Sequence, residues 1–128
     1  MKAANSVQGL RVWQKAMDLV VLCHRVTGTF PADERFGLVS QVRRSAFSIP
    51  ANIAQGFGRW NSREFGRFLS IASGSARELE THLLIAARLG FLSQREAAPL
   101  LAAIDEVARM LFAMLSKIQS RAAKNHHA

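Results

Sequence analysis

Arginines at helical spacing are the residues of this sequence best suited to binding a ligand. Between residues 35 and 77 there are seven basic side chains and one acidic side chain, Glu64. A guanidinium group can bind two phosphate oxygens at once, so clustered arginines suit the backbone of a nucleic acid. The alternative is a solvated face, paired with acids or with a neighbouring subunit, and the sequence leaves both interpretations open. The candidate nucleic-acid-binding residues are Arg43, Arg44, Arg59, Arg63, Arg67 and Arg77.

Three of these arginines surround a break between two expected helices. If the two helices are antiparallel, Arg59, Arg63 and Arg67 gather near one end of the molecule. Trp60 lies among them and offers an aromatic plane on which an unpaired base can stack. We therefore expect phosphate contacts and base stacking at this end.

A second polar stripe lies on the expected helix over residues 34–57. Ser45, Ser48, Asn52 and Gln55 recur every three or four residues and so share one face. Buried polar groups need hydrogen-bond partners, which favours a structural role at a helix or subunit interface. The alternative is a recognition groove for a peptide or an RNA segment.

The residue types that support catalysis or metal binding are not arranged for either. His24 and His82 belong to separate helices without ligand spacing, and we expect them to be packed in the core. Glu78 and Glu80 fall on different helix faces, so they do not form a carboxylate pair. The single cysteine, Cys23, lies in an apolar run and is expected to be a buried, inert thiol. We expect no enzymatic activity, cofactor or metal.

The length, composition and net charge of the chain indicate the number of domains and the kind of partner to expect. The chain has 128 residues, 49% of them hydrophobic, with 3 prolines and a net charge of +8. This length suits one domain over residues 1–128, and the charge favours an anionic partner. No apolar run approaches the ~18 residues needed to cross a membrane, and the expected location is the cytoplasm.

Apolar periodicity and capping signals predict four helices joined by short connections, hence an all-α, antiparallel up-down-up-down bundle. Asn61 with Glu64, and Ser93 with Glu96, have the spacing of helix N-caps, and Gly90 is a natural C-terminal stop. About residues 1–8 and 121–128 are expected to fray. A kink is expected at Pro50. The helices are expected at about residues 10–29, 34–57, 61–89 and 93–120.

The first expected helix is apolar on two sides. Leu10, Trp13 and Met17 mark one stripe, and Val12 and Ala16 belong to another beside it. A helix that is apolar around most of its circumference needs contacts on both sides. We therefore expect a homo-oligomer, with Trp13 at an interface.

Several motifs resemble one bacterial family almost throughout the chain. The central run Gln41-Val42-Arg43-Arg44-Ser45-Ala46-Phe47-Ser48-Ile49-Pro50-Ala51-Asn52-Ile53-Ala54 is followed by Gly56, and matching segments lie at 12–16, 30–31, 34, 36–38 and 74–80. These resemble the four-helix-bundle proteins that include those encoded in intervening sequences of 23S rRNA genes. Gln55 stands where the family usually has glutamate, so a role that needs a carboxylate there does not carry over.

The resemblance implies a four-helix bundle that assembles as a homopentamer. The accessory subunit of diversity-generating retroelements is a distant relative, and it binds a reverse transcriptase and nucleic acid. Our first hypothesis is a basic, oligomeric nucleic-acid-binding accessory protein, with RNA preferred over DNA. The second hypothesis is a protein–protein scaffold whose ring presents a surface to a polymerase-type partner.

Overall fold

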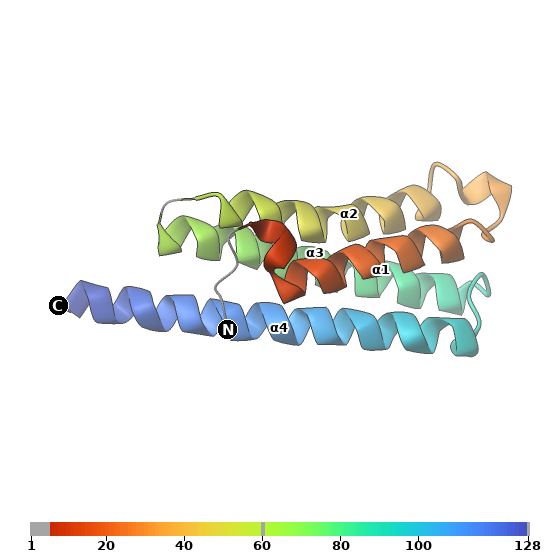
Figure 1. Ribbon diagram of the computed structural model, residues 1–128. Helices are drawn as coiled ribbons and strands as arrows, with labels where there is room; N and C mark the ends of the chain where they lie inside the picture. The colour runs from red at the N-terminus through yellow and green to blue at the C-terminus, as the bar shows by residue number, and fades with distance from the viewer. Residues whose placement is uncertain (1–5, 60, 128) are drawn as a thin grey trace.

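A computed structural model describes residues 6–59 and 61–127 of this chain. Four α-helices pack side by side, and successive helices run in opposite directions (Figure 1). Each helix packs against two others, because α1 contacts both α2 and α4, and α3 contacts the other sides of both. The predicted all-α four-helix bundle is therefore confirmed. The elements are η1 (Val7–Gly9), α1 (Arg11–Thr27), η2 (Ala32–Glu34), α2 (Leu38–Phe57), α3 (Ser62–Arg88) and α4 (Gln94–His127).

The core is formed by one apolar stripe from each helix, supplemented by Phe30 and Leu92 from the connections. On α1 the buried stripe contains Val12, Ala16, Leu19 and Cys23. The other apolar stripe of α1 faces outward, since Met17 and Val21 are exposed and Trp13 is only half-buried. The prediction that α1 is apolar on two sides is confirmed, and its second side is only partly covered by its own chain.

The predicted helix caps form as expected. The Asn61 side chain accepts a hydrogen bond from the Glu64 N–H at 2.8 Å. Ser93 and Glu96 cap each other, because each backbone N–H donates to the other's side chain, at 2.9 and 3.1 Å. The Ser93 backbone N–H, and then its side chain, hold the pKa of Glu96 below its usual value.

The α3–α4 connection starts with a left-handed glycine. Gly90 has φ of 82°, a conformation that glycine adopts without a steric penalty. Its N–H donates to the Ala87 carbonyl at 3.1 Å, and the Phe91 N–H donates to the Ala86 carbonyl at 3.0 Å. This pair of bonds is the Schellman motif, and it satisfies carbonyls that the end of α3 leaves free.

The ends of two helices differ from the sequence prediction. α2 begins at Leu38 rather than near Glu34, because residues 32–34 form a 3-10 turn and Gly37 has non-helical backbone angles. Glu34 lies just before α2, and its carboxylate accepts the Leu38 N–H at 3.3 Å. α2 then continues through Pro50. α4 extends to His127, through residues expected to fray, and Figure 1 shows it passing beyond the α2–α3 connection.

α2 and α3 lie close together near the end of α2. A Cβ built on Gly56 would lie 2.7 Å from the Cβ of Phe68 and 3.0 Å from a ring carbon of Phe65. Cβ contacts below about 3 Å force one of the packed groups to move. Gly56 is therefore required for the spacing of α2 and α3.

We predict that Gly56→Ala destabilises the protein by about 1–3 kcal/mol, the usual cost of overpacking a core. Gly74→Ala is the matched control, since nothing lies within 4 Å of a Cβ at that helical position. That variant should be more stable than wild type by about 0.5–1 kcal/mol, because alanine loses less backbone entropy than glycine. Urea unfolding at one protein concentration measures both. Equal effects of the two substitutions would contradict this account of Gly56.

Candidate nucleic-acid interface

The end of the bundle at the α2–α3 connection carries two arginines over one aromatic ring. The Arg59 and Arg67 guanidinium carbons lie 5.0 and 4.6 Å from the ring centroid of Phe68. Phe68 is buried beneath them, whereas both arginines are exposed. A guanidinium over an aromatic face is attracted by the ring quadrupole and keeps its outer N–H groups free for other partners. The ring thus holds two cations close together at the surface.

Arg63 adds a third cation, one turn before Arg67 on α3 and also exposed. The acid paired with this group is Glu64, whose carboxylate lies 3.1 Å from Arg67 Nε. This exposed pair is worth little to stability and leaves one carboxylate against three arginines. We define Arg59, Arg63 and Arg67 as the α2–α3 arginine cluster. Trp60, the expected stacking residue, lies outside the described residues.

The other three candidate arginines are elsewhere. Arg77 lies roughly 15 Å further along the α3 axis than Arg67, at 1.5 Å per residue. It faces Glu80 at 3.8 Å, and Arg44 lies 3.3 Å from the Glu78 carboxylate. The gathering predicted for Arg59, Arg63 and Arg67 therefore does not extend to the other three candidate arginines.

Arg43 has a structural environment. Its side chain is half-buried, donates to the Thr27 hydroxyl at 2.9 Å and donates to the His24 carbonyl at 3.2 Å. The Thr27 hydroxyl in turn donates to the Cys23 carbonyl at 2.7 Å. Arg43 thus links the start of α2 to the end of α1.

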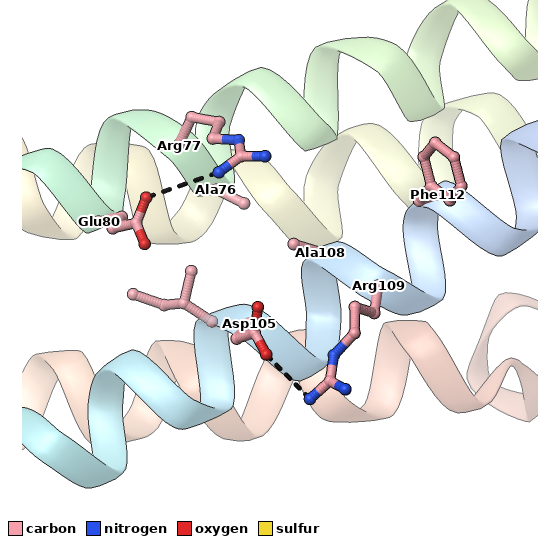
Figure 2. A pocket seen from close by; sticks show the side chains of 8 residues that line it. Ala76, Arg77, Glu80, Asp105, Ala108, Arg109 and Phe112 are labelled. Carbon is pink, nitrogen blue, oxygen red and sulfur yellow. Dashed lines mark ion pairs between the residues drawn. The ribbon is translucent and has the colours of Figure 1, made fainter.

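A groove between α3 and α4 carries balanced charge (Figure 2). Arg77 faces Glu80 on one wall, and Arg109 faces Asp105 at 2.8 Å on the other. Phe112 lies at the α4 side and is exposed. Two acids balance two arginines in this groove of about 200 Å³, so it is a poor site for a polyanion.

The predicted polar stripe of α2 joins α2 to α3. The Ser48 and Ser75 hydroxyls lie 2.7 Å apart across the two helices. The Asn52 amide donates to the Ser48 carbonyl at 2.8 Å and to its hydroxyl at 3.0 Å. Ser45 is buried and bonds to carbonyls of its own helix, whereas Gln55 is exposed. Ser48 thus makes a structural contact between the helices, and Asn52 supports Ser48 from the same helix.

Trp13 lines a second, apolar groove of about 340 Å³ between α1 and α2. No charged side chain lines it, and Phe47 at its edge is half exposed. We call this surface the α1–α2 groove; it is lined by Trp13, Met17, Val20, Phe47, Pro50, Ala51 and Ala54.

Sequence reasoning missed the role of Phe68. Phe68 is a buried residue of α3, as its helical spacing from other apolar residues suggests, but its ring also supports Arg59 from the preceding connection. Arg67 directly precedes Phe68 in the sequence, which was a weak indication that a cation lies over this ring. The contact to Arg59 depends on how α2 ends, which periodicity alone does not specify.

The predicted burial of the cysteine is confirmed, whereas the two histidines, which were expected in the core, differ from each other. Cys23 is buried as predicted, and burial raises the pKa of its thiol to about 12. His82 is half-buried and lies 3.3 Å from the Glu78 carboxylate. The prediction for His24 was wrong, because its side chain is exposed on the outer stripe of α1.

Among the described residues no group of His, Cys, Asp or Glu is placed to hold a metal ion. In the same part of the chain, no helix has both the length and the apolar character to cross a membrane.

The antiparallel helices and the arginine-bearing surface define a small helical-bundle protein. A family model described as 23S rRNA-intervening sequence protein matches residues 8–113, most of the chain. The chain belongs to this family, as the motifs in its sequence indicated.

The fold is also similar to a solved structure. A crystal structure of a protein with unknown function from the S23 ribosomal protein family, from Bacteroides thetaiotaomicron VPI-5482, aligns with a TM-score of 0.74. The two chains are 21% identical, and the alignment covers 81% of this chain and 97% of that chain. This likeness supports the fold. No curated protein matches the chain.

We predict that Ser48 and Ser75 are energetically coupled through their hydrogen bond. Ser48→Ala and Ser75→Ala should each destabilise the protein, and the double variant should cost about 1 kcal/mol less than the two single costs added together. Chemical unfolding of the four proteins in a double-mutant cycle measures the coupling. Strict additivity would show that the two hydroxyls act independently and would reopen the recognition role for Ser48.

Proposed function

We propose that this protein is a non-enzymatic, basic, oligomeric accessory protein that binds nucleic acid, with RNA preferred over DNA. The observation that carries the proposal is the α2–α3 arginine cluster, in which Arg59 and Arg67 lie over the Phe68 ring. The proposed location is the cytoplasm, where the RNA would be found.

The cluster suits phosphate binding for two physical reasons. First, the ring already limits the positions of two guanidinium groups, so less side-chain entropy is lost when they bind phosphate. Second, the three arginines face one acid within the cluster, and the whole chain carries +8, which attracts a polyanion. Phosphate contacts carry no base information, so the binding is largely independent of sequence.

The second part of the proposal is a homopentamer, the assembly that the resemblance implies. The α1–α2 groove supports self-association, because it is apolar, uncharged and includes the exposed Met17 and the half-exposed Phe47. Apolar surface of this kind is stabilised when a neighbouring subunit removes it from water.

A scaffold for another protein is the alternative function. The observation that favours it is the pairing of Arg44, Arg67 and Arg77 with carboxylates, which consumes part of the positive charge. In that case the ring of subunits would present its helix surfaces to a polymerase-type partner. Co-purification of one protein after nuclease treatment would support this function over RNA binding.

We predict that affinity for single-stranded RNA falls steeply with salt, and that replacing Arg59, Arg63 and Arg67 with alanine flattens this dependence. Each lost phosphate contact lowers the slope of log K against log salt by roughly 0.7, so the triple variant should lose about 2. Fluorescence anisotropy across a salt series measures the slope.

The matched control removes the same charge from exposed arginines at the opposite end of the bundle, Arg25, Arg88 and Arg95. This triple variant should keep most of the wild-type slope. Equal losses in the two triple variants would show that only net charge matters, and absence of wild-type binding at low salt would refute the proposal.

We predict that light scattering gives a particle of five chains of 14.1 kDa, and that Ala51→Glu dissociates it. Ala51 is exposed within the α1–α2 groove, so a glutamate there is tolerated by the bundle but unfavourable in a buried contact. Ala102→Glu on the exposed side of α4 is the control and should keep the wild-type mass. A monomer mass for wild type at micromolar concentration would defeat this prediction.

A further inference from the structure

A second concave surface lies at the start of α2, away from the α2–α3 arginine cluster. It is a groove of about 470 Å³ between the turn before α2 and the first turns of that helix. Three arginines and two phenylalanines line it, and no acidic side chain does. We call it the α2 entry groove; it is lined by Arg35, Phe36, Val39, Ser40, Arg43, Arg44 and Phe47.

Phe36 is the unusual member of this groove. Its side chain is 88% exposed, the most exposed large hydrophobic residue of the described chain. The guanidinium carbon of Arg35 lies over the Phe36 ring, 5.6 Å from its centroid, so a cation covers one side of an otherwise exposed aromatic ring. Phe47, half exposed, lies where this groove meets the α1–α2 groove. An exposed aromatic ring is stabilised when a partner covers it, and a flat partner can stack on its face.

The charges of the groove select the kind of partner. Arg35, Arg43 and Arg44 make it positive, and a neighbouring hollow at the α1–α2 connection also contains Arg35 and Arg43 without an acidic lining residue. By contrast, the α3–α4 groove contains Glu80 and Asp105 beside its arginines. A partner that is both flat and anionic fits this combination.

Two of the three arginines already have partners within the protein. Arg43 holds Thr27 and the His24 carbonyl, and Arg44 faces Glu78. Both still line the groove, and their positive charge continues to attract an anion. Arg35 is exposed beside the open Phe36 ring and is therefore the principal phosphate-binding candidate.

We propose that the α2 entry groove binds an unpaired nucleotide of single-stranded nucleic acid, with the base stacked on Phe36 and the phosphate held by Arg35 with help from Arg44. This inference rests on the proposed function and adds to it a second contact that requires an unpaired base. The α2–α3 arginine cluster binds phosphates. The α2 entry groove binds an unpaired base, so it favours a strand with accessible bases over a strand without them.

The test compares two strands of equal charge. The full-length protein is titrated against a fluorescent oligoadenylate of about 12 nucleotides and against an abasic strand of the same length, which keeps the phosphates and lacks the bases. Phe36→Ala should weaken binding of the oligoadenylate roughly 5- to 100-fold, the usual loss of one base–aromatic stack. Its affinity for the abasic strand should not change. Phe36→Trp should restore the preference for the strand with bases.

Phe112→Ala is the matched control, because Phe112 is also exposed, at 71%, but lies in the charge-balanced α3–α4 groove. It should bind both strands as wild type does. Circular dichroism and light scattering on each variant confirm fold and mass.

The outcomes separate the two proposals. If wild type binds neither strand, the proposed function fails. If wild type binds but Phe36→Ala leaves the oligoadenylate affinity unchanged, or weakens both strands equally, the α2 entry groove is not a base-stacking site and the proposed function survives. A change of oligomeric mass in Phe36→Ala without loss of base preference would assign the ring to a subunit contact instead.

Discussion

The contact between α2 and α3 is the constraint on which the rest of the structure depends. Gly56 allows the end of α2 to approach Phe68 and Phe65, and Ser48 with Ser75 joins the two helices further along. These two contacts fix the spacing of α2 and α3 at two points along their length. Because Arg59 follows α2 and Arg67 belongs to α3, this spacing also decides whether they meet over one ring.

The same packing explains why a basic sequence gives an uneven surface. Arginines along the middle of α3 and α4 have acids three or four residues away on their own helix, as in Arg77 with Glu80 and Arg109 with Asp105. At the α2–α3 end one acid faces three arginines, and three arginines but no acid line the α2 entry groove. Ends of helices are also where backbone and side chains are most accessible to a ligand. Net charge alone would not have distinguished these regions.

Sequence reasoning succeeded where local rules determine structure. The caps at Asn61 and Ser93 and the stop at Gly90 follow from hydrogen bonds between residues three or four positions apart, and they were predicted. Sequence reasoning failed where the contact of a long side chain depends on how other helices are placed. Arg43 contacts α1, and Phe68 receives Arg59 from another element, and neither contact has a local sequence signal. The later start of α2 depends likewise on the turn at Gly37.

The lone thiol of α1 gives this protein an internal probe of its own opening. Cys23 has no exposed surface, and its raised pKa keeps it in the unreactive thiol form. An alkylating reagent therefore reaches it only when α1 separates from the core. The rate of modification in plain buffer would report the free energy of that opening, without denaturant and without an introduced label. Comparing the rate at several protein concentrations would then show how much assembly contributes to keeping α1 in place.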